Sequence, residues 1–217
     1  MLTLSSRLVV ITGALAFGSL ACAEDLYDGA GINAFRLEVA QGPESVDWAT
    51  DLGSGGNIIV DGEEDADQAY RVALSGSRRN NMPFSFVFGG ALAYTHLEED
   101  RSGDDDRFQS LTVDARIGAA IALGRIFHVE ATPFIGAGAG RGEVGGEDSD
   151  LGLVWEYGIQ GGIFLTITQF QVGVVGGWIH SEWDLDFDNG GSIGPDAINV
   201  ELTHEGTFIG LAIGGVM

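Results

Sequence analysis

Lysine is absent from this 217-residue chain, and cysteine occurs only once, at position 22. The few arginines are outnumbered by 32 aspartates and glutamates, which gives a net charge of −22 at pH 7. A surface of that sign repels the phosphate backbone of nucleic acids, so we expect no nucleic-acid partner. A single cysteine also excludes an internal disulfide framework. The sequence contains no zinc-ligand spacing, no phosphate-binding glycine loop and no nucleophile elbow.

Long apolar runs are confined to the N-terminus, where residues 8–20 follow one basic residue, Arg7. This run is shorter than the roughly 20 residues that a membrane-spanning helix needs. It leads into an Ala-Cys-Ala sequence, which matches the small-residue pattern of a signal-peptidase site. We therefore expect residues 1–23 to be a secretory signal peptide and residues 24–217 to form one domain. Lipoprotein processing at Cys22 is the alternative.

The stretch Gln109–Gly140 alternates apolar residues with polar or small ones at a period of two. Its first run, Leu111–Leu123, has an apolar residue at every odd position. The alternation resumes after Arg125 and continues over Phe127–Ala137. Two such runs around a tight turn predict a β-hairpin with one apolar and one polar face. Each run is about twice the usual strand length, which suits a tilted strand that crosses a bilayer.

Eight strand-like segments follow the expected signal peptide, separated alternately by long and very short connections. The segments lie near residues 32–40, 68–77, 83–96, 107–122, 126–141, 152–166, 169–183 and 199–216. The long connections 41–67, 97–106, 142–151 and 184–198 are rich in acids, whereas arginines occupy the short turns. This pattern predicts an all-β, eight-stranded antiparallel up-and-down transmembrane β-barrel, with short periplasmic turns and both chain ends on the periplasmic side.

Alternation alone does not say which face of a barrel is outside. The polar face consists mainly of glycine, alanine, serine and threonine rather than the long charged side chains of a water-exposed surface. That composition favours a narrow barrel with lipid outside over a soluble barrel of lipocalin type. Aromatic residues also gather at both ends of the apolar face, as at Phe84 and Tyr94. Their spacing covers about 24 Å at the usual rise and tilt, close to an apolar band of about 25 Å.

Several ionisable side chains near the middle of the strands are predicted to point into the lumen. They are Arg36, Glu38, Arg71, Asp114, Arg116, His128, Glu130 and Glu156. Because buried charges must be paired and hydrogen-bonded, we interpret them as an ion-pair network that fills the interior. The alternatives are a proton or ion path through the barrel, and a carboxylate–histidine site at His128 and Glu130.

The acidic loops suggest a weak metal site. Asp184, Asp186 and Asp188 begin like a calcium loop, but the glycine then falls one place late and Pro195 stands where the ligand glutamate is required. We expect no dedicated cofactor, with loosely bound calcium or magnesium as the alternative. The acids that such ions would bridge to lipopolysaccharide phosphates are Asp104, Asp105, Asp106, Asp184, Asp186 and Asp188.

A hydrolase site is the second chemical candidate, because His180, Ser181 and Glu182 are consecutive. Small barrels that deacylate lipid A place histidine and serine two residues apart, on one face of a strand. Here the two residues are adjacent and would point to opposite faces. We therefore expect no enzymatic activity, and a lipid A-modifying enzyme is the least favoured alternative.

The eight alternating strands, short turns, aromatic girdles and charged lumen resemble the small eight-stranded outer-membrane barrels, the OmpA/OmpX/OmpW-like group. This resemblance implies the outer membrane of a Gram-negative bacterium, contact with outer-membrane lipid and lipopolysaccharide, insertion by the barrel assembly machinery, and a monomeric state. These families usually end in an aromatic residue, whereas this chain ends in Met217. We expect a structural or surface-interaction role through the acidic loops, with a narrow channel or carrier for small solutes as the alternative.

Overall fold

The computed structural model describes residues 31–43, 45–52, 59–66, 68–101, 104–123, 126–144, 147–187 and 198–217. The expected signal peptide lies outside these residues. The strands are β1 (Gly31–Gln41), β2 (Ser45–Leu52), β3 (Ile59–Asp65), β4 (Gln68–Asn80), β5 (Phe84–Arg101), β6 (Asp104–Leu123), β7 (Phe127–Val144), β8 (Glu147–Asp148), β9 (Gly152–Ile167), β10 (Phe170–Phe187) and β11 (Ile198–Val216). Within the described ranges, no helix has the length and apolar character needed to cross a membrane.

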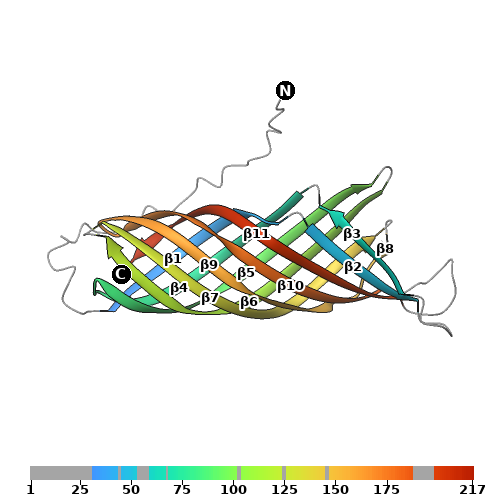
Figure 1. Ribbon diagram of the computed structural model, residues 1–217, viewed down its shortest axis with the longest axis horizontal. Coiled ribbons are helices and arrows are strands. Elements are labelled where there is room, and N and C mark those ends of the chain that lie inside the picture. Colours follow the sequence, from blue (N-terminus) through green and yellow to red (C-terminus); the bar gives the residue numbers. More distant parts are fainter. Residues whose placement is uncertain are drawn as a thin grey trace, which may run out of the picture.

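Eight long strands close into an antiparallel ring in the order β1-β4-β5-β6-β7-β9-β10-β11, and β11 pairs back to β1 (Figure 1). Each of these strands corresponds to one of the eight segments predicted from alternation. The eight-stranded up-and-down barrel is therefore confirmed. The start of β1 and the C-terminus lie at the same end of the barrel, the end with the short turns.

The strands extend further at the opposite end than the sequence suggested. Residues 98–101 of β5 pair with residues 104–107 of β6, so most of the segment expected as a long loop at 97–106 is a hairpin. Residues 184–187 of β10 likewise pair with residues 198–201 of β11. Backbone hydrogen bonds form the ladder whatever the side-chain polarity, so acidic sequences continue as strand beyond the membrane.

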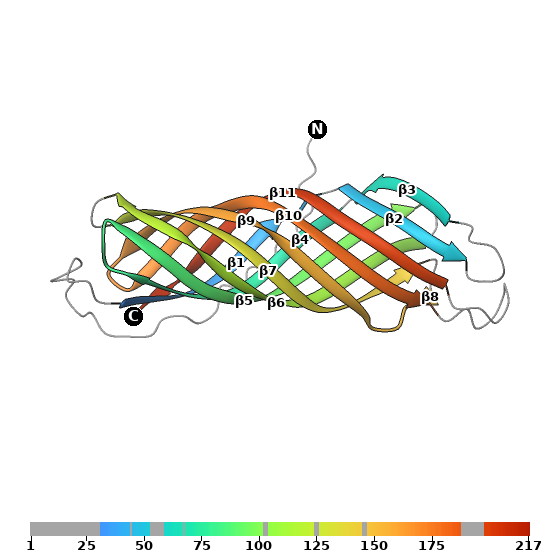
Figure 2. The same ribbon diagram turned by 60° about the horizontal axis from the view of Figure 1, so that its bottom comes forward.

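The first long connection forms the hairpin β2–β3, which lies at the barrel end away from the C-terminus (Figure 2). β2 takes over the pairing with β11 where β1 stops: Gln41 pairs with Ile209, and Val46 pairs with His204. Between these pairs, Pro43 cannot donate a ladder hydrogen bond. Gly206 opposite has a φ of 139°, and a Cβ there would lie 2.7 Å from the Cβ of Pro43. Glycine is therefore required at this seam in the wall.

Side chains alternate between the lumen and the outer surface as the sequence predicts. On β6, Leu111, Val113 and Ile117 are each more than half exposed, whereas Thr112 and Asp114 between them are buried. Exposed aromatics mark both ends of this apolar band, and further exposed phenylalanines, such as Phe86 and Phe88, lie within it. Those at the ends are Phe84, Phe127 and Phe170 on the short-turn side, and Tyr70, Trp155 and Tyr157 on the other. The apolar face is thus outside, where lipid contacts it.

An arginine in the middle of this band tests the lipid-facing assignment. We expect Ile117→Arg to lower the free energy of unfolding by about 2–4 kcal/mol, because the charge would face hydrocarbon. Glu201→Arg is the matched control, since Glu201 is exposed beyond the band and should change stability by about 0–1 kcal/mol. Urea titration in lipid vesicles measures both values. Equal effects of the two substitutions would contradict the assignment.

Candidate functional site

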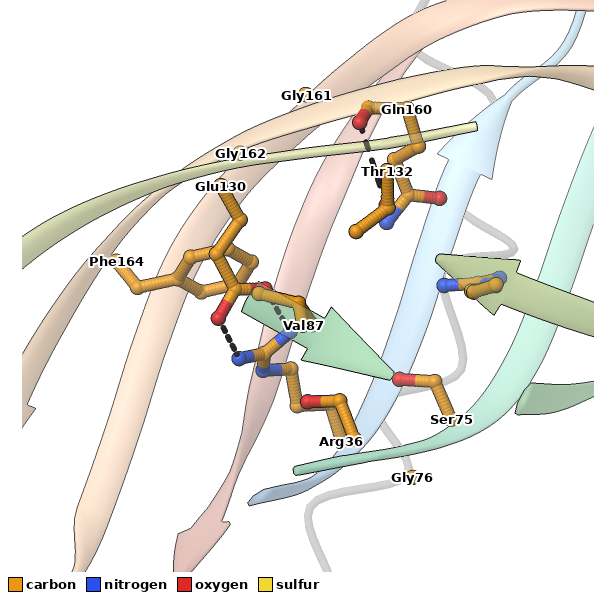
Figure 3. Close-up of a pocket in the computed structure, with 12 residues that line it drawn as sticks. Arg36, Ser75, Gly76, Val87, Glu130, Thr132, Gln160, Gly161, Gly162 and Phe164 are labelled. Atoms are coloured by element: carbon orange, nitrogen blue, oxygen red, sulfur yellow. Dashed lines mark hydrogen bonds and ion pairs between the residues drawn. The ribbon is translucent and has the colours of Figure 1, made fainter. Parts of the chain in front are cut away.

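The lumen near the short turns holds an arginine clamp. Arg36 on β1 reaches across to Glu130 on β7, with Nη1–Oε2 and Nη2–Oε1 distances of 2.7 and 2.8 Å (Figure 3). Its Nε–H donates to the side-chain oxygen of Gln171. The Nε2 atom of His128 lies 3.0 Å from Oε1 of Glu130. Phe164 packs against both Arg36 and His128, with its ring stacked on His128 and 3.9 Å below the Arg36 guanidinium. The paired Arg–carboxylate geometry is the strong, directional form of this interaction.

A second arginine binds two carboxylates from different strands. Nη2 of Arg71 lies 2.7 Å from Oδ2 of Asp114 and 2.6 Å from Oε1 of Glu156, while Nη1 lies 2.8 Å from Oε2 of Glu156. The hydroxyls add further hydrogen bonds: Thr112 donates to Glu156 at 2.9 Å, and Thr95 accepts from Arg71 at 3.2 Å. The guanidinium therefore ties β4 to β6 and β9 across the barrel.

A third arginine joins the Arg71 group to Glu38. Nη1 of Arg116 lies 3.0 and 3.2 Å from the two carboxylate oxygens of Glu38, and its Nη2 lies 3.6 Å from Oδ2 of Asp114. Ser75 and Gln160 also donate to Glu38, at 2.6 and 3.2 Å. All eight predicted lumen residues are thus buried and in contact. Three of them form the Arg36–Glu130–His128 group, and the other five are joined through Arg116.

The space left between these groups is very small. A cavity of about 10 Å³ lies among Arg36, Ser75, Glu130, Gln160 and Phe164 (Figure 3). A volume of that size holds about one water molecule. The described side chains therefore fill this level of the barrel rather than line a passage.

Several interior residues were not predicted from the sequence. Gln171, Thr112 and Ser75 complete the hydrogen bonds of the charged groups, and Phe134 and Phe164 pack among them. The period of two already places these positions on the inward face. The period of two does not show how the large rings of Phe134 and Phe164 fit on a face made mainly of small residues.

Beyond the charged groups, the polarity of the interior reverses. An apolar core is formed by residues from most strands of the ring. Its buried members are Val46, Ala66, Ala69, Leu97, Val154, Trp183, Leu185, Phe187 and Leu202. The indole N–H of Trp183 donates to the hydroxyl of Ser181 at 2.7 Å, so its polar atom is satisfied inside this core. We call this cluster the upper core.

His204 lies beside the upper core and is almost fully buried. Its Nε2–H donates to the backbone oxygen of Pro43 at 2.9 Å. This position lies beyond the apolar band. Burial lowers the pKa of His204 to about 4, while the hydrogen bond to Pro43 opposes the shift. The imidazole is therefore neutral at pH 7 and compatible with apolar surroundings.

The outer surface around the upper core is acidic. The exposed acids at this end are Asp47, Asp148, Asp150, Glu182, Asp184, Asp186, Glu201 and Glu205. In the apolar band, the wall is apolar outside and charged inside. Beyond the band it is acidic outside and apolar inside, as in a soluble β-barrel.

Three of the six proposed metal ligands have described side chains, and these three do not lie together. Asp184 and Asp186 are exposed on β10, and Asp106 is buried on β6. For Asp104 and Asp105 only the strand backbone is described, and Asp188 lies outside the described residues. Where side chains are described, no group of three histidine, cysteine, aspartate or glutamate residues is arranged to hold a metal ion.

His180 and Ser181 face opposite sides of the wall, as their adjacency predicts. Ser181 is buried in the interior, where it accepts the Trp183 hydrogen bond. On the outside, Nδ1 of His180 lies 2.7 Å from Oε2 of Glu205, and Nε2 lies 3.2 Å from Oε1 of Glu182. His180 lies at the outer end of the apolar band, level with Tyr157. Partial burial opposes the charged form, but the two carboxylates raise the pKa of His180 above its ordinary value.

Removing the central arginine tests the importance of the lumen network. We expect Arg71→Ala to lower the free energy of unfolding by about 3–5 kcal/mol, because Asp114 and Glu156 would lose their buried cationic partner. Arg107→Ala is the control, since Arg107 is partly exposed and pairs with Glu98 at 3.4 Å. An exposed pair of that kind contributes about 0–1 kcal/mol. Urea titration in vesicles followed by tryptophan fluorescence gives both values, and a cost for Arg71→Ala no larger than for the control would contradict the prediction.

No protein-family model matches the chain, and no curated protein matches it. Solved structures that resemble it include several outer-membrane proteins. OprG from Pseudomonas aeruginosa is 11% identical over 89% of this chain and 99% of its own, with a TM-score of 0.50. The Neisserial surface protein A is 13% identical over 82% and 96%, with a TM-score of 0.41, and Ail of Yersinia pestis is 10% identical over 86% and 99%, with a TM-score of 0.40. The chain therefore has the fold of a small outer-membrane β-barrel protein.

Proposed function

We propose that this protein is a sealed outer-membrane barrel that holds an acidic, strand-built platform at the cell surface. Its role is structural or interactive, and it neither conducts solutes nor catalyses a reaction. The membrane placement implies lipopolysaccharide and the barrel assembly machinery as partners, and a monomer as the working unit.

The filled interior is the observation that carries this proposal. In the apolar band, Arg36, Arg71 and Arg116 each bridge strands through buried carboxylates. Beyond the band, the upper core excludes water with apolar side chains such as Trp183 and Leu202. An ion would have to pass both layers, and it would meet either paired charges or a dry core. Both layers favour a closed barrel over the channel alternative.

The acidic surface supports the second part of the proposal. Exposed carboxylates gather on the strands beyond the band, where Asp184 and Glu201 face each other across the β10–β11 ladder. The whole chain carries a charge of −22. A surface of this kind attracts cationic partners over distances near the Debye length of about 8 Å. Like charges opposite one another destabilise a sheet, which indicates that solubility or recognition rather than stability keeps them there.

The hydrolase alternative receives no support from the outer wall. Ser181, the only serine or threonine beside His180 in sequence, is on the opposite side of the strand from His180. The imidazole nitrogens both contact carboxylates, so neither is directed at a hydroxyl nucleophile. Nucleophilic catalysis needs the nucleophile and the base within hydrogen-bond reach.

Electrical recording tests the sealed lumen. We expect the purified protein in planar lipid bilayers to show no conductance above that of the lipid alone, because paired charges and the upper core occupy the described interior. A porin inserted under the same conditions is the positive control. Discrete openings of the wild-type protein, altered in Arg116→Ala, would overturn the sealed barrel in favour of a channel.

Binding of a cationic probe tests the platform. We expect octa-arginine to bind the protein in nanodiscs, with an affinity that falls as salt rises and is about tenfold lower in the triple variant Asp184→Asn, Asp186→Asn, Glu201→Gln. Arg141→Gln is the control of opposite sign: Arg141 is exposed at the same end, and its loss should strengthen binding. Fluorescence anisotropy of labelled peptide measures the affinities. Binding that is insensitive to salt and to all four substitutions would refute the electrostatic role.

A further inference from the structure

Two clusters of similar composition lie on the outer wall, at the end of the apolar band that carries Tyr70 and Tyr157. In each, an aromatic residue, a histidine and a glutamate occupy alternate positions of one strand, and a tyrosine of the adjacent strand pairs with the histidine. The members are Tyr70, Tyr94, His96 and Glu98 in one cluster and Tyr157, Trp178, His180 and Glu182 in the other. The tyrosine and histidine rings are 4.8 and 4.9 Å apart, respectively. Because β5 and β10 are separated by four steps in the ring of eight, the clusters lie on opposite sides of the barrel.

The two clusters differ in the number of carboxylates. His96 contacts one, at 3.4 Å from Glu98, and its Nδ1 has no hydrogen-bond partner among the described residues. His180 contacts two, because Glu205 of β11 joins Glu182. Two carboxylates around one imidazolium leave the His180 cluster with an excess negative charge. The side chains of Glu182 and Glu205 are 65% and 49% exposed, so their remaining oxygens are accessible from outside.

The His180 cluster also adjoins a cavity, through Glu205. This outer cavity has a volume of about 530 Å³, within the usual range for small-ligand sites. Its polar lining comes from Gln41, Ser45, Glu205 and Thr207. The cavity exists because β1 leaves β11 at Gly42 before β2 rejoins it, at the seam described above.

The position of the outer cavity relates it to lipid. Thr207, which lines it, pairs with Trp178 at the end of the apolar band. Ile209 forms its lower edge, and Leu211 continues the same outward face two residues further into the band, with both side chains about two-thirds exposed. A molecule in the cavity can therefore keep a polar group beside Glu205 and an alkyl chain along Ile209 and Leu211. That is the shape of a membrane lipid.

We propose that the outer cavity binds the ammonium-bearing headgroup of an outer-leaflet lipid. The ammonium would donate hydrogen bonds to the free carboxylate oxygens of Glu205 and Glu182, near the ring of Trp178. No arginine is among the described residues that line the cavity, so a headgroup with phosphate as its only charge lacks a partner there. A lipid is favoured over a soluble amine because the cavity opens beside the apolar band. The proposal depends on the membrane placement of the barrel but not on the acidic platform.

Native mass spectrometry of the full chain in detergent micelles tests this site. The probes are phosphatidylethanolamine, phosphatidylglycerol and phosphatidylcholine with identical acyl chains. We expect phosphatidylethanolamine, which carries a primary ammonium, to bind at least about fivefold more tightly than phosphatidylglycerol. Its advantage over phosphatidylcholine should be smaller but measurable, because the quaternary nitrogen of phosphatidylcholine cannot donate hydrogen bonds. Glu205→Gln should abolish the preference over phosphatidylglycerol. Thr207→Trp, which fills the cavity without changing charge, should abolish it too.

The opposite cluster provides the matched control. Glu98→Gln removes the carboxylate beside His96, where no second carboxylate of the described side chains joins the imidazole, and should leave the preference unchanged. Heat-modifiable migration in gels confirms that each variant is folded. Equal binding of the three lipids, or equal losses in Glu98→Gln and Glu205→Gln, would overturn the proposal. Binding of soluble glycerophosphoethanolamine as tight as that of the lipid would overturn the lipid as the occupant.

Discussion

The structure depends on the closing ladder between β1 and β11, where residues 34–41 pair with residues 209–216. In hydrocarbon, every backbone N–H and C=O must be satisfied within the protein, so a sheet can cross a membrane only as a closed ring. Closure with eight strands leaves an interior just wide enough for side chains. Large apolar residues therefore face outward, while the interior combines glycine and alanine with a few large groups that touch across the axis.

Charge inside such a narrow barrel is acceptable only when each group meets its partner. Arg36, Arg71 and Arg116 are held by carboxylates of other strands, so the same contacts that neutralise the lumen also connect the wall across its interior. Beyond the lipid this constraint disappears, because water solvates the outside. The wall then carries acids outward and an apolar core inward. The protein thus resembles a membrane barrel continued by a short soluble one.

How much of this structure the sequence predicts depends on what the alternation of apolar and polar residues indicates. It places the strands and the inward face, including Arg36 and Glu130, but the contact between these residues spans 94 positions and follows from ring closure and shear. The alternation of apolar and polar residues alone does not identify the upper core. The run Trp183–Phe187 alternates apolar and acidic residues as regularly as the membrane strands do. Its acids and partial calcium motif predict a loop from residue 184 onward, whereas residues 184–187 continue β10, with Asp184 and Asp186 outward and Leu185 and Phe187 inward.

The seam at Pro43 and Gly206 follows from the same boundary. Within the apolar band, an interruption of the ladder would leave backbone groups facing hydrocarbon, at a cost of several kcal/mol for each. At the end of the band, water or lipid headgroups can satisfy such groups, so β1 can leave β11 and β2 can join it. The wall therefore opens at headgroup depth rather than deeper. The opening lies beside Glu205, which pairs with His180 in the β10–β11 ladder, and beside the lipid-facing Ile209. The twin cluster on β5 has one carboxylate, Glu98, against its imidazole among the described residues, and Glu98 does not line the cavity. The second carboxylate and the cavity beside it are what make the His180 cluster the candidate binding site.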